Sequence, residues 1–404
     1  MKYPSTDRQR RFLELAEPLA RRFAERAAQH DAEGSFPFEN FADLREAGLL
    51  GLTTPEQYGG LGANELEYAL TLERLAWGDA STALALGMSL SNIGQIAEGA
   101  LWPDRAPALF REVAQQGAML NTAQAEPEMG SPSYGGLPAT KARRDPTGGW
   151  RLSGRKIYTT GAPGLRYFIV MAAIEEEGRS PRIGDFLTPS DAPGLRIEQT
   201  WNALALRSSG SDDLILDDVW VAEEALLGAR EPGQPDPRAA LGLPWGSLTL
   251  AAVYTGAAMA ARDEVAHFAA TRVPTALGKP LGELPNVRMR LGEIESLLLA
   301  SRRVMYGLAE DWVSSPEARA ALRQEAPMVK VITTNNAVRV TDLALRITGG
   351  QGLQRGRRLE RVFRDVRAGL INAPIEDVVL QNAGKAAVDA ELRALKEQPS
   401  PERV

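Results

Sequence analysis

A switch from helical to strand-like periodicity, and back again, constrains this chain of 404 residues more than any other feature of its sequence. From residue 5 to about 118, apolar residues recur at spacings near 3.6, as in Gln9–Asp31. From about Ala118 to Ala222 the apolar runs are short, alternating and interrupted by glycine and proline. The helical spacing then returns after the Pro/Gly-rich segment Gly228–Arg238. This order predicts an α+β protein in three parts.

The three parts have predicted boundaries. We expect an N-terminal helical domain over residues 1–118, a central antiparallel β-barrel domain over 119–230, and a C-terminal four-helix bundle over 231–404. The predicted C-terminal helices cover 248–271, 287–313, 316–347 and 375–395.

Composition excludes several classes of function. The net charge of -6 and the pI near 5.4 disfavour a nucleic-acid or anionic-membrane surface, either of which needs a basic excess. The absence of cysteine excludes disulfides and thiolate chemistry. No segment approaches the roughly 20 apolar residues that a bilayer span needs, so we expect a cytoplasmic protein. His30 and His267 are far apart and match no metal-binding spacing, and we interpret both as ordinary helix residues.

The common nucleotide-binding fingerprints fail here. The sequence has no GxxxxGK[ST] motif, and the glycine cluster Gly349–Gly352 follows a helical run instead of joining a strand to a helix. A tightly bound nicotinamide cofactor therefore loses support.

Six segments, in a fixed order, resemble signatures of the acyl-CoA dehydrogenase superfamily. No single match is specific, but their common order covers nearly the whole chain. The segments are Ala125–Pro132 (AEPEMGSP, like TEPxxGSD), Tyr158–Ala162 (YTTGA, like WITNG), Leu206–Val221, Arg272–Pro285, Ile347–Leu353 (ITGGQGL) and the Arg364–Asp365 pair.

The resemblance implies FAD as cofactor, with one group of residues around the flavin ring. Gly130 and Ser131 would donate to the flavin pyrophosphate or to a substrate thioester, and Tyr158 would lie on the isoalloxazine face. Thr160 would approach the N5 edge of the ring. In and around the segments Ala125–Pro132 and Tyr158–Ala162, the other expected cofactor contacts are Thr122, Gln124, Ala125 and Thr159.

A second group implied by the resemblance would hold the ADP part of FAD from a neighbouring subunit. Arg272 would make a charge-assisted contact with the diphosphate, and Arg346 would contribute to a cradle for the ADP part. The other members are Leu277, Gly349, Gly350 and Gln351. Since the flavin site is incomplete without them, the resemblance implies a homo-oligomer, either a tetramer or a dimer.

The glutamate base of the family is missing from both of its usual places. Acyl-CoA dehydrogenation removes an α-proton while hydride passes to the flavin, so a carboxylate has to reach the α-carbon. Counting from Asp365 places Ala373 at the common position of the base. Aligning on Gly256 places Gly246 at the alternative position. Neither residue can accept a proton.

Two interpretations follow from the missing base. In the first, the chain oxidises an acyl-CoA, passes electrons to an acceptor flavoprotein, and uses Glu376 or Asp377 as the base, although first-turn acids after Pro374 are also ordinary helix-start residues. In the second, it resembles the class D flavin monooxygenases, which lack the glutamate and take reduced flavin from a reductase. That group often has histidine where this chain has Asn372.

The substrate would be a small molecule in both cases. Ser131 and Trp245 are the predicted substrate contacts, although an anchoring role at a helix start explains Trp245 equally well. A non-catalytic, DNA-binding relative is a third possibility that the acidic composition disfavours.

Overall fold

The computed structural model describes residues 3–128, 136–234, 236 and 238–397. Its first part is helical, and local signals fix the ends of the helices. Thr6 caps α1 (Asp7–Glu33) by accepting from the Gln9 amide, and the helix ends at Gly34 in the left-handed region. Asn64 and Glu67 form a capping box at the start of α3 (Glu65–Gly78). The other helices are α2 (Phe38–Glu46), α4 (Ala80–Glu98) and α5 (Ala106–Gln116), with single 3-10 turns at Leu49–Gly51 and Glu56–Tyr58.

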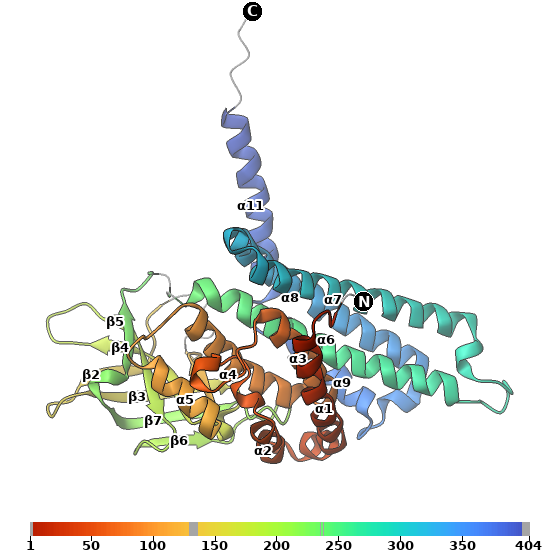
Figure 1. Cartoon of the computed structure of the whole chain (residues 1–404), viewed down its shortest axis with the longest axis horizontal. Coiled ribbons are helices and arrows are strands. Elements are labelled where there is room, and N and C mark those ends of the chain that lie inside the picture. The colour runs from red at the N-terminus through yellow and green to blue at the C-terminus, as the bar shows by residue number, and fades with distance from the viewer. Residues whose placement is uncertain (1–2, 129–135, 235, 237, 398–404) are drawn as a thin grey trace, which may run out of the picture.

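The second part is an eight-stranded sheet at one end of the molecule, beside α4 and α5 (Figure 1). Its strands are β1 (Leu120–Ala123), β2 (Lys141–Arg144), β3 (Trp150–Thr159), β4 (Tyr167–Glu175), β5 (Arg182–Pro189), β6 (Leu195–Glu198), β7 (Asp212–Val221) and β8 (Leu226–Arg230). The strand order is β6-β7-β3-β2-β4-β5-β8, and β1 pairs with β4.

The sheet is mixed, which differs in detail from the antiparallel barrel expected from the sequence. Both β1 and β2 run parallel to β4, while the other described pairings are antiparallel. Within the described strands no pairing joins the outer strands β6 and β8. Alternation of apolar residues shows which face of a strand is buried but not the direction of its neighbour, so the parallel pairs had no signal in the sequence.

The third part consists of long helices that pack against one another and against α3. Its main helices are α6 (Ala239–Thr271), α7 (Pro285–Ser314), α8 (Arg319–Thr348), α9 (Arg358–Asp365), α10 (Ala368–Ile371) and α11 (Glu376–Glu397). Short 3-10 turns lie at Leu281–Glu283, Pro316–Ala318 and Gly349–Leu353. Figure 1 shows that α11 projects away from the other helices, and most of its side chains are exposed.

The predicted helix–sheet–helix order is thus confirmed. No described helix is long and apolar enough to cross a membrane. The described residues also contain no group of three or more His, Asp and Glu side chains that could hold a metal ion. His30 lies within α1, buried, where its ring contacts Ser35 Oγ at 2.8 Å and Glu39 Oε1 at 2.7 Å, as an ordinary helix residue.

The crossing of α3 and α6 leads to a test of the packing. A Cβ on Gly256 of α6 would meet the Glu73 carbonyl oxygen of α3, which is part of a rigid backbone. We expect Gly256→Ala to lower the free energy of unfolding by about 1–3 kcal/mol through overpacking. Gly307→Ala on α7 is the control, because no described atom lies within 4 Å of its added Cβ. Chemical denaturation measures both, and equal stability of the two variants would contradict the close contact.

Candidate functional site

The segments around Ala125 and Tyr158 converge in the structure. The Ile157 amide donates to the Ala125 carbonyl at 2.9 Å, and Asn121 Nδ2 donates to the Thr160 carbonyl at 2.9 Å. The Thr160 hydroxyl lies 3.0 Å from Ser211 Oγ, just before β7. Two of the segments predicted to surround a flavin ring therefore lie side by side at the end of β3.

Tyr158 presents its aromatic ring outward because the backbone is irregular there. The pairing of β3 with β7 shifts register between Lys156 and Thr159, and Tyr158 has a φ of 58°, which is unusual for a residue other than glycine. Such bulges redirect side chains. The Tyr158 side chain is 64% exposed, and its ring packs edge-on against Trp201 at 6.1 Å. Its ring therefore offers exposed area for stacking.

A buried ion pair anchors both converging segments. Lys156 Nζ lies 2.5 Å from Glu126 Oε1, and both side chains are fully buried. The Glu126 carboxylate also accepts from the amides of Ala139, at 2.6 Å, and Thr140, at 3.0 Å. It thereby ties Glu126 to residues 139 and 140. The predicted site residues Gly130 and Ser131 lie outside the described part of the chain.

Next to these segments lies a cavity of about 590 Å³, lined by all three parts of the chain. The predicted residues Thr122 and Gln124 line it, and so do Gly246 and Ala373, the two positions where the family carries its base. A Cβ on Gly246 would have no described atom within 4 Å. Both vacant base positions thus face one and the same space.

Most of the other lining residues are polar and were not predicted from the sequence. Amides and hydroxyls come from α4, β1 and α6, and an ion cluster comes from the region between β8 and α6. The polar members are Ser91, Asn92, Gln95, Asn121, Gln234, Ser247, Arg230, Asp236 and Arg238, and the apolar members are Met88, Met171, Ile183, Leu243 and Pro374.

The ion cluster neutralises its own charges. Asp185 accepts from Arg230 and Arg238, each at 3.0 Å, and Arg238 also binds Asp236 at 2.8 Å. Burial alone would raise the pKa of Asp236, but the adjacent Arg238 outweighs it, so this pKa lies below its usual value. Asp236 is the one carboxylate among the described lining residues, and it stays ionised and paired.

The loop that contains Ala373 is held from below by two buried residues. Lys330 Nζ donates to the carbonyls of Asn372, at 2.9 Å, and Pro374, at 3.1 Å. The Tyr254 hydroxyl binds the Asn372 side chain. Burial lowers the pKa of Lys330 to about 8, against the opposing charge of Glu376. No sequence pattern indicated this role for Lys330, which lies within α8.

The two predicted bases and Trp245 are not among the described residues that line the cavity. Glu376 and Asp377 lie in the first turn of α11, where acids are common at helix starts. Trp245 is 3% exposed, packs against Gly94 of α4, and donates to Glu98 at 2.8 Å. It anchors α6 on α4, whereas its neighbours Leu243 and Gly246 reach the cavity.

The residues predicted to bind ADP lie far from this cavity. Arg272 ends α6, 26 positions after Gly246, which at 1.5 Å per residue is a separation of about 39 Å along the helix. Arg290 near the start of α7 donates to the Arg346 carbonyl at 3.5 Å, which places the end of α8 at the same end of the bundle. Leu277 follows Arg272 in the connection between α6 and α7, and Gly349, Gly350 and Gln351 lie in the 3-10 turn directly after α8; Figure 1 shows how these helices are arranged. One chain therefore does not bring the two predicted groups together.

Comparisons with known proteins identify the family. The model of the acyl-CoA dehydrogenase N-terminal domain matches residues 6–100, the middle-domain model matches 121–219, and the C-terminal-domain model matches 248–373. The chain belongs to the acyl-CoA dehydrogenase superfamily. It is therefore a flavin-dependent oxidoreductase of this superfamily.

Individual superfamily members match more than nine tenths of the chain. "Putative acyl-CoA dehydrogenase YdbM" of Bacillus subtilis is 40% identical, over 95% of this chain and 98% of its own length. "Amino sugar nitrososynthase DnmZ" of Streptomyces peucetius is 30% identical, over 91% and 90%. The structure of butyryl-CoA dehydrogenase from Megasphaera elsdenii is similar with a TM-score of 0.84, at 26% identity and over 96% and 100%.

The groups on this chain fit the flavin that the superfamily uses. Tyr158 offers an exposed ring, and the hydroxyls of Thr159 and Ser247 are buried without a hydrogen-bond partner among the described residues. Unsatisfied buried hydroxyls are costly, and a bound ligand with polar edges can relieve that cost. The two hydroxyls therefore indicate a ligand that forms hydrogen bonds in addition to stacking on the Tyr158 ring.

The buried ion pair leads to a second test. We expect Lys156→Met to lower the free energy of unfolding by about 3–5 kcal/mol, because it leaves the Glu126 carboxylate buried without its counter-charge. Lys141→Met is the control on β2, since the Lys141–Glu175 pair is half exposed and worth less than about 1 kcal/mol. Equal losses in denaturant melts would show that the buried pair has no special role.

The same pair predicts a pH dependence. Burial raises the pKa of Glu126, but Lys156 and the loop amides lower it further than burial raises it, so the net pKa lies below its usual value. A lowered acid pKa stabilises the fold above the unfolded value, about pH 4.3, and this contribution is lost as the pH falls through the folded value. In Lys156→Met burial is no longer outweighed by Lys156, so the folded pKa of Glu126 rises and this acid-dependent loss of stability should shrink, which melting curves from pH 7 to 3 would reveal.

Proposed function

We propose that this chain is a flavin-dependent monooxygenase that acts on a small polar substrate with oxygen and with flavin reduced by a separate reductase. The observation that carries the proposal is that Gly246 and Ala373 both line the cavity. General-base help is worth about 10²- to 10⁴-fold in rate. A cavity with neither carboxylate is poorly equipped for removing an α-proton.

The remaining carboxylate in the described lining does not replace the missing base. Asp236 accepts from the Arg238 amide and from its guanidinium, each at 2.8 Å, and its pKa is lowered. A base with a lowered pKa, already engaged by two donors, takes up protons weakly at neutral pH. The cluster is better suited to holding the segment between β8 and α6 in place, where it lines the cavity.

The polarity of the cavity supports a polar substrate. The side-chain amides of Gln95 and Gln124 line the space without a hydrogen-bond partner among the described residues, whereas those of Asn92 and Asn121 bond within the protein. A polar ligand would satisfy the two free amides, and an acyl chain would leave them unpaired. An amino sugar nitrososynthase among the relatives supports the same class of substrate, a hydroxylated or amino-bearing small molecule.

Reduced flavin supplies the oxygen-activating chemistry when it is bound, and the chain supplies the groups that position the flavin and the substrate. Tyr158 gives an aromatic surface, and the Thr160 hydroxyl, held by Ser211, gives a polar edge beside it. Lys330 and Tyr254 hold the loop of Ala373 in place. The amides of Gln95 on α4 and Gln124 after β1 orient a substrate over this surface and replace the water that would otherwise solvate it.

Oxygen dependence is the direct test. With FAD, a flavin reductase and NADH, we expect consumption of a polar amine or sugar substrate that stops when oxygen is removed. Under anaerobic conditions, a panel of acyl-CoA thioesters should leave the absorbance of the oxidised flavin unchanged. A reductase-only reaction without this chain is the control for uncoupled oxygen use. Bleaching of the flavin by any acyl-CoA would overturn the proposal.

Acyl-CoA dehydrogenation is the second candidate, and the 40% identity with a protein named as a putative acyl-CoA dehydrogenase favours it. It requires a carboxylate in the cavity, and Glu376 and Asp377, at the start of α11, are the nearest in sequence to Ala373. In this case, Glu376→Gln or Asp377→Asn should abolish the bleaching that the thioester panel produces. An acceptor flavoprotein would then replace the reductase.

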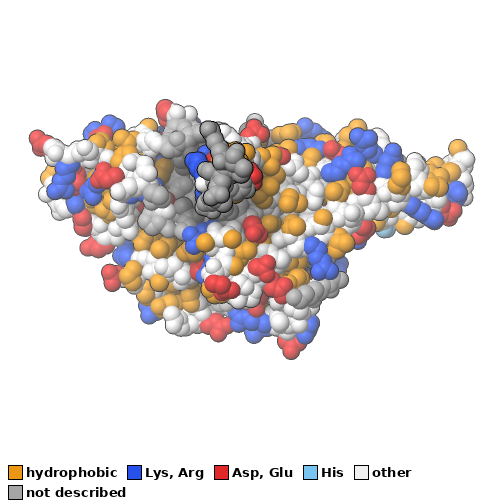
Figure 2. Space-filling view, turned by 90° about the horizontal axis from the view of Figure 1, so that it is seen from above, with side chains coloured by type: hydrophobic (Ala, Val, Ile, Leu, Met, Phe, Trp, Pro, Cys, Tyr) orange, Lys and Arg blue, Asp and Glu red, His pale blue; other side chains and the backbone are white. Residues whose placement is uncertain are grey.

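We also propose FAD as the cofactor and a homo-oligomer, either a dimer or a tetramer, as the assembly. Because Arg272 lies about 39 Å along α6 from Gly246, and Arg346 lies at the same end of the bundle, we infer that they hold the ADP end in another copy. Figure 2 looks onto the face from which α11 projects, where apolar and charged side chains alternate. The apolar residues Leu380, Val388, Leu392 and Leu395 of α11 are exposed, as expected of a helix that packs on a partner.

The cofactor proposal predicts a difference between two flavins. We expect Arg272→Ala to weaken FAD binding by about 10- to 100-fold, the worth of a charge-assisted hydrogen bond. Binding of FMN, which lacks the AMP part and keeps only one of the two phosphates, should change much less. Arg303→Ala, an exposed position on α7, controls for the lost charge. Fluorescence titration of the apoprotein measures both flavins, and an equal loss for FMN would contradict an ADP contact.

A further inference from the structure

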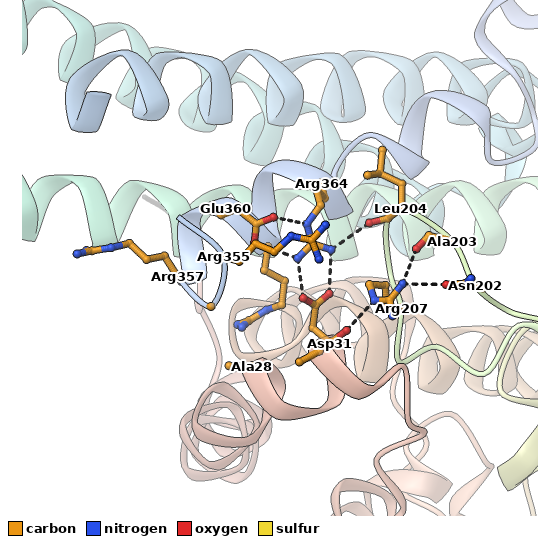
Figure 3. Close-up of a pocket in the computed structure, with 13 residues that line it drawn as sticks. Ala28, Asp31, Asn202, Ala203, Leu204, Arg207, Arg355, Arg357, Glu360 and Arg364 are labelled. Atoms are coloured by element: carbon orange, nitrogen blue, oxygen red, sulfur yellow. Dashed lines mark hydrogen bonds and ion pairs between the residues drawn. The ribbon is translucent and has the colours of Figure 1, made fainter. Parts of the chain in front are cut away.

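A second pocket, of about 290 Å³, lies away from the cavity and shares none of its described lining residues. It opens between α1, the loop before β7 and the start of α9 (Figure 3). We call it the arginine pocket. Its lining residues are Ala28, Asp31, Ala32, Asn202, Ala203, Leu204, Arg207, Arg355, Gly356, Arg357, Glu360, Arg361 and Arg364.

The carboxylates of the arginine pocket are already used. Arg364 binds both oxygens of Asp31, at 3.0 and 2.6 Å, and both oxygens of Glu360, at 2.6 and 3.1 Å. Arg207 donates to the Asp31 carbonyl at 2.6 Å and to Asn202 at 3.2 Å. Figure 3 shows these contacts converging on Asp31 and Arg364. With five arginines and two acids in the lining, three positive charges are left over.

The surplus charge belongs to Arg355, Arg357 and Arg361. None of these side chains has a hydrogen bond or ion pair with any residue in the described part of the chain. Arg361 is only 6% exposed. Its charge acts on the buried Asp365 four positions later on α9, but no described group accepts a hydrogen bond from its guanidinium. The Arg361 guanidinium thus lines an open space with its hydrogen-bond donors unused.

The helix that carries these residues adds to the positive field. Arg357 and Arg361 are four positions apart on α9 and repel each other on one face. Arg357 is also the N-cap of α9 and makes no side-chain capping bond, so basic residues stand where a helix prefers negative charge. Burial, and after it the charge of Arg361, lowers the pKa of Arg358 to about 10.

We propose that the arginine pocket binds a phosphate-bearing small molecule, with Arg361 as the buried contact and Arg355 and Arg357 at the rim. Guanidinium groups bind phosphate oxygens through paired, charge-assisted hydrogen bonds. A diphosphate carries about the charge needed to balance the surplus of three. The ligand is distinct from the flavin of the proposed function, since no described residue is shared with the cavity and none of the predicted cofactor residues lines this pocket.

Inorganic pyrophosphate is the probe, titrated calorimetrically into the full chain saturated with FAD. We expect saturable binding of one pyrophosphate per chain at constant ionic strength. Arg361→Met should weaken it by about 10- to 100-fold, and so should the double variant Arg355→Ala/Arg357→Ala, whose exposed positions spare the fold. Arg303→Met removes one exposed charge elsewhere and should bind as the unaltered chain does.

Three results would overturn the proposal: no saturable heat, equal binding by Arg361→Met and the unaltered chain, or release of FAD by pyrophosphate, which would place the probe at the flavin diphosphate. The absorbance spectrum of the flavin, recorded in parallel, reports the last of these. A protein that takes up no FAD would contradict the proposed function, whereas its pyrophosphate titration would still test the arginine pocket.

Discussion

One pair of adjacent residues fixes the positions of the three parts of this chain relative to one another. Arg364 reaches from α9 to Asp31 of α1 and to the Leu204 carbonyl before β7, while the buried Asp365 accepts from the Leu206 amide at 2.7 Å. Burial raises the pKa of Asp365 to about 7, and the Leu206 amide opposes that rise. Since the cavity is lined from all three parts, its shape depends on this joint, and loosening it would disturb the site without touching a lining residue.

The order of the elements could be predicted because periodicity records which face of an element is buried. The strand expected from Trp150 is β3, and the helix expected over 287–313 is α7, Pro285–Ser314. Prediction failed where the decisive information is not local. The helix expected from Leu248 begins earlier, at Ala239, because Pro244, a residue type that usually interrupts a helix, lies within α6. The short helices α9 and α10 were not expected.

The site was only partly predictable for a similar reason. Shared motifs indicated that Ala125 and Tyr158 would meet, and the strand ends do converge there. The amides of Asn92 and Gln95 come from α4, whose small residues predict close helix packing and do not reveal which side faces a cavity. Lys330 is buried within α8, and only the folded chain shows that it holds the loop of Ala373. Sequence patterns report burial, but polar groups that meet across parts of a chain leave no such pattern.

The empty space beside Gly246 bears on how this superfamily diversifies. Nothing in the described structure would resist a side chain there, and a glycine inside a helix is a weak choice for stability by about 1 kcal/mol. Folding therefore exerts little selection at this position, in contrast to Gly256 ten residues later on the same helix. A lineage can gain or lose a carboxylate at this point while the scaffold stays intact, so chemistry and substrate, not architecture, decide what evolution keeps there.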